Sequence, residues 1–428
     1  MEIYVVRPGD SLYRIAQKFH VPMDRLLRDN QLPDPSRLSV GQALVVQFPA
    51  QTYTVRQGDT LSSIAQAHGI SLRQLLRNNF GLSRQAELPP GQTIVLAYQQ
   101  SSKSPLSVNG YAYPHIEPAL LADALPYLSS LTPFTYGLTA DGGLIPLEDQ
   151  RLLHGAISSG VQPLLHLSAQ TEGGGFSGEL AHTILNDSAI QDRTAEDLLQ
   201  TIHSKGYAGL DIDFEYLPSE DASLYAQFVG RMRQLLSPMG LPVLAALAPK
   251  AFAAQPGTLY EGHNYRLLGQ AADRVLLMTY EWGYTYGPPM AVAPIRNVRQ
   301  VVEYALTEIP AHKIWLGIPT YGYDWTLPYT KGRKAISLSN PRALSLAAEF
   351  RVSIRYDETA QSPWFSYTDC QGQPHEVWFE DARSIRAKLS LAAEYGLAGV
   401  GYWNLMRPFA QNWVLLNALY QVQDPPSL

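Results

Sequence analysis

Three carboxylic acids occupy alternate positions in one short segment of this 428-residue chain. Asp211, Asp213 and Glu215 are separated by apolar residues, namely Leu210, Ile212 and Phe214. Such alternation predicts a β-strand with the carboxyls on one face and the apolar side chains on the other. Because unpaired buried carboxylates are costly, we expect a hydrogen-bonded, half-buried cleft with shifted pKa values, which suits acid–base catalysis. The alternative is an edge strand with a solvated acidic face.

The elements that must position this segment alternate between strands and helices from residue 106 to residue 428. We predict eight strands, at Ser107–Ala112, Pro133–Tyr136, Gln162–Leu167, Gly209–Glu215, Pro242–Ala248, Arg274–Tyr280, Ile314–Pro319 and Gly399–Trp403. Helical patterns lie between most of them, which predicts an α/β fold, a (β/α)8 TIM barrel. A doubly wound open sheet is the alternative, but no Gly-rich phosphate loop follows the first strand. We predict that residues from about 324 to about 380 form a small α+β insertion between strands seven and eight. This insertion would make one wall of the cleft.

Aromatic residues follow the carboxyl ends of the predicted strands, where such barrels place their active sites. They are Tyr111, Tyr136, Tyr280, Trp282, Tyr321, Tyr323 and Trp403. Aromatic rings pack on the C–H faces of sugars, so carboxyls and aromatics together predict a glycan-binding cleft. The alternative for each of these side chains is a place in the core.

The acidic segment resembles the signature of glycoside hydrolase family 18, Asp-x-x-Asp-x-Asp-x-Glu on the fourth barrel strand, with Ala208 in place of the first Asp. The run from Met278 through Tyr280 resembles the family's Met-x-Tyr-Asp, with Glu281 in place of Asp. Trp403 matches the tryptophan that ends the eighth strand and forms the floor of the −1 subsite. The Ser-x-Gly-Gly motif of the third strand is poorly kept. The resemblance extends over the whole barrel.

This resemblance implies hydrolysis without a protein nucleophile, the exception to the usual two-carboxylate scheme. Glu215 would be the general acid and then the base, while the substrate's own acetamido oxygen attacks the anomeric carbon, so that configuration is retained. Asp213 would orient the acetamido group, Tyr280 would hydrogen-bond its oxygen, and Asp211 would share a proton with Asp213. The implied substrate-binding residues are Trp403, Glu281, Trp282, Tyr111, Tyr136 and Tyr321. We expect no cofactor and no metal, because no histidine lies near the acidic residues.

Composition excludes several other classes of protein. The chain is 46% hydrophobic and 16% charged, which indicates two or three globular domains. Its net charge of −6, without a basic stripe, argues against a nucleic-acid partner. The single cysteine, Cys370, permits no intrachain disulfide. We also expect no membrane span and no secretory signal.

The first hundred residues contain one pattern twice. Residues 4–12, Tyr-Val-Val-Arg-Pro-Gly-Asp-Ser-Leu, recur at 53–61 as Tyr-Thr-Val-Arg-Gln-Gly-Asp-Thr-Leu. The phrases Ile-Ala-Gln and Leu-Leu-Arg-x-Asn follow in both copies. A short strand, a Gly-Asp turn, a Ser or Thr N-cap and helical spacing predict two βααβ units, at 1–48 and 51–98, with a linker at 99–105.

Each unit resembles the LysM domain over nearly its full length. LysM domains bind glycans containing N-acetylglucosamine in a shallow groove between the loop after the first strand and the loop before the last. Carried over to this chain, the resemblance implies glycan binding by Gly9, Asp10, Ser11, Leu12, Gly58, Asp59, Thr60 and Leu61. The alternative is that these residues form only the turn and the helix cap.

Two LysM units ahead of such a barrel resemble the spore cortex-lytic N-acetylglucosaminidases of endospore-forming bacteria. That resemblance implies a monomeric peptidoglycan hydrolase made in the mother cell without a signal peptide and built into the spore. Because muramic-δ-lactam has its nitrogen locked in a ring, it cannot supply the attacking acetamido group. We therefore expect cleavage after N-acetylglucosamine. The alternatives are a chitinase with LysM targeting and an inactive glycan-binding lectin.

Overall fold

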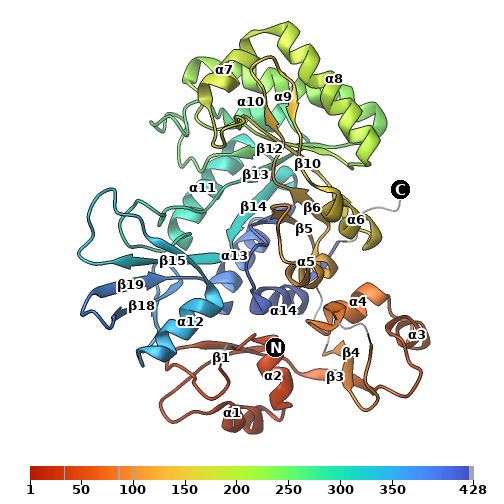
Figure 1. Ribbon diagram of the computed structural model, residues 1–428, viewed down its shortest axis with the longest axis vertical. Coiled ribbons are helices and arrows are strands. Elements are labelled where there is room, and N and C mark those ends of the chain that lie inside the picture. The colour runs from red at the N-terminus through yellow and green to blue at the C-terminus, as the bar shows by residue number, and fades with distance from the viewer. Residues whose placement is uncertain (33, 85–86, 100–102, 424–428) are drawn as a thin grey trace.

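The computed structural model describes residues 1–32, 34–84, 87–99 and 103–423, and it places two small N-terminal units against a large barrel (Figure 1). The first unit contains β1 (Glu2–Val5), α1 (Leu12–Phe19), α2 (Met23–Asp29) and β2 (Ala43–Val46). The second contains β3 (Pro49–Thr54), α3 (Leu61–Ala67), α4 (Leu72–Arg77) and β4 (Thr93–Tyr98). In each unit the two strands pair antiparallel, which confirms both βααβ predictions.

The barrel is a parallel sheet of strands with the order β10-β11-β12-β13-β14-β20-β5-β6-β9. Its strands are β5 (Ser104–Ala112), β6 (Ser130–Pro133), β9 (Gln162–Pro163), β10 (Leu165–Ser168), β11 (Leu210–Asp213), β12 (Val243–Leu247), β13 (Arg274–Leu277), β14 (Ile314–Pro319) and β20 (Gly399–Trp403). Only Leu164 separates β9 from β10, and its N–H donates to Leu131 O at 2.9 Å. The two pieces therefore act as one third strand that closes the sheet, as a (β/α)8 barrel requires.

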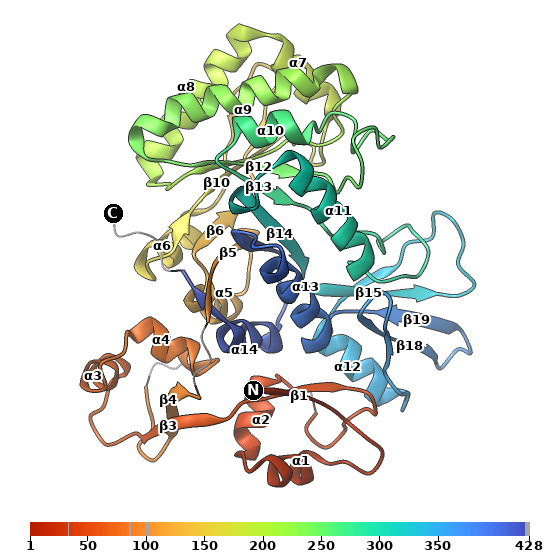
Figure 2. The same cartoon turned by 180° about the vertical axis from the view of Figure 1, so that it is seen from behind.

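Helices surround this sheet (Figure 2). They bury the outward-facing apolar side chains of the strands. They are α5 (Pro118–Ala124), α6 (Gln150–Ser158), α7 (Gly178–Asn186), α8 (Ser188–Lys205), α9 (Ala222–Leu236), α10 (Tyr265–Ala271), α11 (Ile295–Glu308), α13 (Ala382–Glu394) and α14 (Ala410–Leu419). Inside the barrel a second cluster fills the space, and it includes Leu164, Leu244, Leu276 and Trp315. This inner cluster makes the barrel a packed body rather than a pore.

The predicted insertion is an antiparallel sheet of order β16-β15-β19-β18-β17 with one covering helix. Its elements are β15 (Tyr321–Thr326), β16 (Ile336–Ser339), α12 (Asn340–Glu349), β17 (Arg355–Asp357), β18 (Ser362–Thr368) and β19 (Pro374–Trp378). It begins at Tyr321, a few residues before the predicted start. A buried cluster around Phe365 and Val377 packs under α12 and gives the insertion a core of its own.

Several boundaries differ from the predictions, among them those of the second barrel strand and of the linker. The second barrel strand is Ser130–Pro133, not Pro133–Tyr136. The prediction missed it because the inward side chains of this strand are polar. The hydroxyls of Ser130 and Thr132 donate to Asn109 Oδ1 at 2.8 Å and 3.0 Å, and this pairing removes the cost of burying them. The expected linker 99–105 is shorter, since Ser104 and Pro105 belong to β5; residues 100–102 lie outside the described part of the chain.

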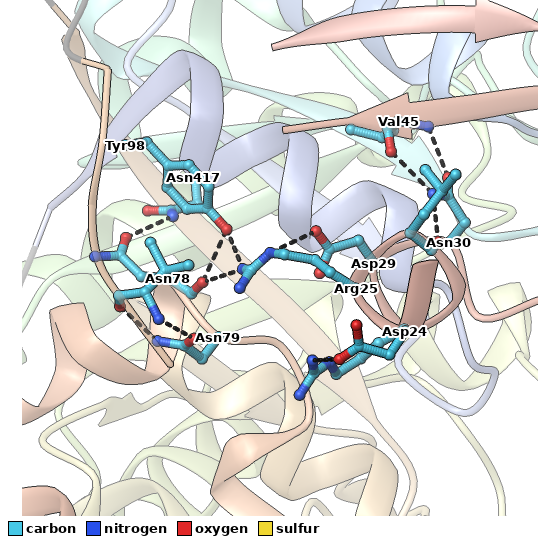
Figure 3. A network of polar contacts seen from close by, with 12 residues as sticks. Asp24, Arg25, Asp29, Asn30, Val45, Asn78, Asn79, Tyr98 and Asn417 are labelled. Carbon is cyan, nitrogen blue, oxygen red and sulfur yellow. Dashed lines mark hydrogen bonds and ion pairs between the residues drawn. The ribbon is translucent and has the colours of Figure 1, made fainter. Parts of the chain in front are cut away.

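A buried polar network joins the two N-terminal units to the barrel (Figure 3). The guanidinium of Arg25, on α2, lies between Asp29 Oδ2 at 3.3 Å and the carbonyl of Asn78 at 2.8 Å, and it also donates to Tyr98. On the barrel side, the amide of Asn417 in α14 donates to Asn78 Oδ1 at 3.1 Å. Since the Arg25 and Asp29 side chains are only 8% and 4% exposed, the two units and α14 form one packed interface.

The loop before β2 makes a second contact, with the insertion and with α13 of the barrel. Ile354 N–H donates to Val40 O at 2.8 Å, and the guanidinium of Arg383 donates to Gly41 O at 3.1 Å. Gly41 has a φ of +85°, and a Cβ placed there would lie 1.8 Å from Ile354 O. Only glycine fits this close approach. Among the described residues, no helix is both long enough and apolar enough to cross a bilayer.

Candidate active site

A cavity of about 560 Å³ opens at the carboxyl ends of the barrel strands. Many of the residues that line it carry aromatic side chains, namely Tyr111, Phe134, Phe176, Tyr216, Tyr260, Tyr280, Trp282, Tyr284 and Trp403. Two of the carboxyls, Asp213 and Glu215, reach its surface. The combination of aromatic faces and a few acids is the one that the sequence predicted for a glycan cleft.

The acidic segment adopts the predicted alternation. Leu210, Ile212 and Phe214 are fully buried in the core between the strands and the helices. Asp211 and Asp213 point into the barrel and are 0% and 4% exposed. Glu215 lies two residues beyond the end of β11 and is half-buried at the cavity. The alternative of a solvated edge strand is wrong, because β11 pairs with β10 on one side and β12 on the other.

Burial controls the acidity of these three groups. It raises the pKa of Glu215 to about 7, so this acid keeps its proton near neutral pH. Burial also raises the pKa of Asp211 to about 6, against the opposing hydrogen bond that Tyr111 donates to its Oδ2 at 2.7 Å. The pKa of Asp213 is raised by burial first and by the neighbouring Glu215 and Asp211 carboxyls next. A protonated carboxylic acid facing a cavity is suited to general acid catalysis.

Two oxygens in this group have no hydrogen-bond partner among the described residues. They are Oδ1 of Asp211 and Oδ1 of Asp213. Buried polar atoms are nearly always satisfied in folded proteins, and an exception inside a cavity points to a ligand or water that completes the bonding. Asp213 borders the cavity, so its free oxygen is available to a bound molecule.

A histidine lies beside the carboxyls, contrary to the expectation from the sequence. Nε2 of His166, on β10, is 3.7 Å from Oδ2 of Asp213, and the imidazole lines the cavity. Sequence reasoning missed it because residue 166 is far from the acidic segment in the chain and meets it only through the parallel pairing of β10 with β11. Burial lowers the pKa of His166 to about 3, so the ring is neutral at physiological pH.

Tyr280 and Glu281 follow β13 and form the opposite side of the cavity. The ring of Tyr280 rests on Gly317 of β14, where a Cβ would come within 2.8 Å of it. Glu281 has a φ of +65°, an unusual conformation for a residue with a side chain. Its carboxylate accepts hydrogen bonds from Tyr321 and, at 3.1 Å, from Tyr323. Tyr321 therefore does not line the cavity but supports Glu281 from the insertion.

Trp403 packs edge-on against other rings at the end of β20. Its ring centroid lies 4.8 Å from that of Phe134 and 5.7 Å from that of Tyr111. These contacts fix the indole as a wall of the cavity, and Trp282 lines another part of the same space. Both are available to stack on a sugar ring.

Tyr136, for which the sequence predicted a substrate-binding role, is not among the residues that line the cavity. Its hydroxyl donates to Asp149 and accepts from Lys205 Nζ at 2.7 Å, between β6 and the helices. The predicted second strand was displaced by three residues, so the expected strand end was misplaced. The cavity residues that sequence reasoning missed include Phe134, His166, Phe176, Leu259, Tyr260 and Tyr284. Tyr284 carried a signal, because it belongs to the aromatic run after the sixth strand, whereas Leu259 and Tyr260 lie in a loop without periodicity.

The turn residues of the N-terminal units have local structural partners. Asp10 accepts hydrogen bonds from Tyr4 and from Arg7 N–H, both at 2.7 Å, and Asp59 is bound in the same way by Tyr53 and Arg56. The hydroxyls of Ser11 and Thr60 cap α1 and α3. The remaining members of the predicted set are the turn glycines Gly9 and Gly58 and the core-packed Leu12 and Leu61.

The two units differ in the loop before their last strand. In the first unit this loop is bound to the insertion through Val40 and to α13 of the barrel through Gly41. In the second unit Pro89, Pro90 and Gly91 are exposed, and nothing lies within 4 Å of a Cβ placed at Gly91. The same repeat thus offers a free loop in only one of its two copies. Over the described residues, no group of three or more His, Cys, Asp or Glu side chains is arranged to hold a metal ion.

Comparisons with known proteins agree with this geometry. A model of the glycosyl hydrolases family 18 matches residues 156–407, and a LysM domain model matches residues 4–47 and 53–97. The cortical fragment-lytic enzyme of Bacillus subtilis (strain 168) is 42% identical over 432 residues, covering 99% of this chain and 99% of that protein. The spore cortex-lytic enzyme SleL of Bacillus megaterium QM B1551 superposes with a TM-score of 0.83 at 38% identity, covering 99% of this chain and 98% of that one. SleL of Bacillus cereus gives a TM-score of 0.84 at 37% identity, with coverage of 99% and 98%.

Proposed function

Because this chain belongs to glycosyl hydrolase family 18, we propose that it is a retaining N-acetylglucosaminidase that cleaves spore cortex peptidoglycan during germination. The observation that carries the proposal is the half-buried Glu215 with its pKa raised to about 7, facing an aromatic cavity. We propose cortex as the substrate because the relatives that match nearly the whole chain are named as lytic enzymes of cortex or its fragments.

Glu215 would donate its proton to the glycosidic oxygen, and the bond to the anomeric carbon would break as the substrate's acetamido oxygen attacks that carbon. This forms an oxazolinium ion, and Glu215 then takes a proton from the water that opens the ring. Asp213, whose Oδ1 is free, would accept the acetamido N–H and stabilise the positive charge. Tyr280 would hydrogen-bond the acetamido oxygen from β13, and Tyr111 would hold Asp211 beneath.

The loss of the first aspartate of the family signature, at Ala208, leaves this scheme intact. Tyr111 already supplies a hydrogen bond to Asp211, and the raised pKa values of Asp211 and Asp213 allow the pair to share a proton. Sharing keeps the charge beside Glu215 low and helps this acid to stay protonated. Trp403, Trp282 and Glu281 would bind the sugar around the reacting centre.

The bond that is cut follows from the acetamido requirement. Muramic-δ-lactam cannot supply the attacking oxygen in this way, because its nitrogen is part of the lactam ring. The sugar in the −1 subsite would therefore be N-acetylglucosamine, and each cut would leave it at a new reducing end.

The N-terminal units would hold the enzyme on its glycan, and we assign this role mainly to the second. Its loop at 89–91 is exposed, whereas the matching loop of the first unit is bound to the insertion. The first unit would then serve to fix the insertion, which carries Tyr321 and Tyr323 against Glu281. We further propose that the protein acts as a monomer in the spore, having been made in the mother cell.

Analysis of reaction products tests the proposed function. Purified cortex is digested, reduced with borohydride and examined by mass spectrometry, with Glu215→Gln as the inactive control. We expect N-acetylglucosaminitol ends from the wild type and almost none from the variant. Reduced muramic ends alone would overturn the assignment, and equal activity of the variant would exclude Glu215 as the acid. Faster hydrolysis of chitin oligomers than of cortex fragments would instead indicate a chitinase, and binding without hydrolysis would indicate a lectin.

A further inference from the structure

A neutral, buried imidazole stands behind the carboxylate that orients the substrate in the proposed mechanism. His166 is 1% exposed, and its Nε2 is 3.7 Å from Oδ2 of Asp213. Its other ring nitrogen, Nδ1, is 2.6 Å from the hydroxyl of Thr135, which is itself buried. The ring is further held by the side chain of Phe134, with 4.7 Å between centroids. These contacts fix the direction in which Nε2 points.

The contact of the Thr135 hydroxyl with Nδ1 bears on which ring nitrogen carries the proton, because the hydroxyl donates to Nδ1 in one imidazole tautomer and accepts from it in the other. A neutral imidazole has one donor and one acceptor, so a hydroxyl that donates to Nδ1 leaves the hydrogen on Nε2. The Thr135 hydroxyl has a second acceptor in Ser168 Oγ, 3.0 Å away, so in the tautomer with the proton on Nε2 the Ser168 hydroxyl turns to donate to Thr135. With this arrangement Nε2–H faces Asp213, and a modest closure of the 3.7 Å gap would make a hydrogen bond. Catalytic contacts are often long in unliganded sites and shorten when substrate binds.

The other groups around Asp213 do not supply this hydrogen bond in the structure. The titratable side chains that face it come from β11 and the residues after it, from β5, from β13 and from α9: Asp211, Glu215, Tyr216, Tyr111, Tyr280 and Tyr225. Among the described residues none of them donates a hydrogen bond to Asp213, since the Tyr111 hydroxyl is committed to Asp211. His166 is therefore the donor best placed to stabilise Asp213 when that side chain is ionised.

We propose that His166 is a positioning residue, which donates from Nε2 to Asp213 when the oxazolinium ion forms and holds its carboxylate toward the acetamido group. The inference rests on the proposed function, because it assigns His166 through the role of Asp213. A hydrogen bond made to the ionised form stabilises the transition state more than the ground state, so its loss should lower kcat more than it raises KM.

Two substitutions separate positioning from mere packing. The amide of His166→Gln can reach the place of Nε2, whereas that of His166→Asn reaches only the place of Nδ1 and leaves Asp213 without a donor. We expect kcat on cortex fragments to fall about 10-fold to 100-fold in His166→Asn, the usual cost of losing a hydrogen bond to a charged group. His166→Gln should recover most of it. The acidic limb of kcat/KM should move to higher pH in His166→Asn, since Asp213 then ionises less readily.

Equal losses in both variants, with an unmoved acidic limb, would overturn the proposal and leave a packing role. A second measurement uses the wild type alone: ¹⁵N NMR of labelled histidine, with the His166 signals assigned by their absence from His166→Gln. Above the alkaline limb of activity we expect the proton on Nε2, and a proton found on Nδ1 at every pH would refute the inference. This spectrum needs no substrate, so it stays informative if the wild type cuts no cortex, an outcome that would count against the proposed function instead.

Discussion

Replacing Glu215 with glutamine is expected to stabilise the folded protein at neutral pH while it removes the catalytic acid. Burial raises the pKa of Glu215 from 4.5 to about 7. As the pH rises from about 4.5 to about 7, the unfolded chain releases this proton while the folded chain keeps it, so wild-type stability falls across that window. Below about 4.5 both states are protonated and the penalty is absent. Glutamine does not titrate, and the variant avoids the loss.

The size of the effect follows from the pKa difference. One pKa unit corresponds to about 1.4 kcal/mol, so the full penalty on the wild type is about 3 kcal/mol once the pH exceeds about 8. At a pH of about 4.5 the same contribution is only about 0.4 kcal/mol. Neutralising Glu215 also removes a charge that raises the pKa of Asp213, and this change acts in the same direction. Any difference in packing between the two side chains adds an offset that does not depend on pH.

Urea unfolding followed by tryptophan fluorescence at several pH values measures this difference. The control is Glu196→Gln, which makes the same change at an exposed position on α8. The free energy of unfolding of Glu215→Gln minus that of the wild type should increase by about 2.5 kcal/mol as the pH rises from about 4.5 to about 7. An advantage that is flat across this range, or that shrinks as the pH rises, would refute the burial of a protonated acid at this site.

Two further substitutions test the docking of the first unit and the place of Tyr136 outside the cavity. Gly41→Ala adds a Cβ that would lie 1.8 Å from Ile354 O, whereas Gly91→Ala has a similar φ, +90° against +85°, and meets nothing within 4 Å. Backbone strain should lower the free energy of unfolding of both variants by about 1 kcal/mol. Only Gly41→Ala should lose a further amount of about 1–3 kcal/mol and become sensitive to proteolysis at the interface. Equal losses in the two variants would contradict the docking. Tyr136→Phe should lower stability by about 1 kcal/mol through its lost bond to Asp149 and leave kcat unchanged, and a raised KM would return Tyr136 to the site.

The sequence predicted the parts of the fold that depend on local pattern. The period-two alternation at Asp211 and Asp213 predicted a strand, and this strand is paired on both sides in the barrel. The repeated turn and cap residues predicted both βααβ units. The second barrel strand was misplaced because Ser130 and Thr132 make it look like a loop, and the pairing with Asn109 that allows their burial is not local.

The features that the sequence did not predict share one cause, because each depends on contacts between residues far apart in the chain. His166 reaches Asp213 only through the pairing of β10 with β11, and its spacing from the acidic segment carries no signal. The docking of the first unit depends on surface complementarity between Gly41 and Ile354, which no periodicity encodes. Sequence patterns thus predicted which elements form and which acids could react, whereas the neighbours of those acids had to come from the three-dimensional arrangement.

The central claim is that the substrate's own acetamido oxygen is the nucleophile. Aryl N-acetylglucosaminides whose acetyl group carries zero, one, two or three fluorine atoms test it most directly, because fluorine makes that oxygen a progressively poorer nucleophile. If the account is correct, kcat/KM falls steeply with each added fluorine. A rate that does not change across the series would contradict it, since bond cleavage would then proceed without help from the acetamido group.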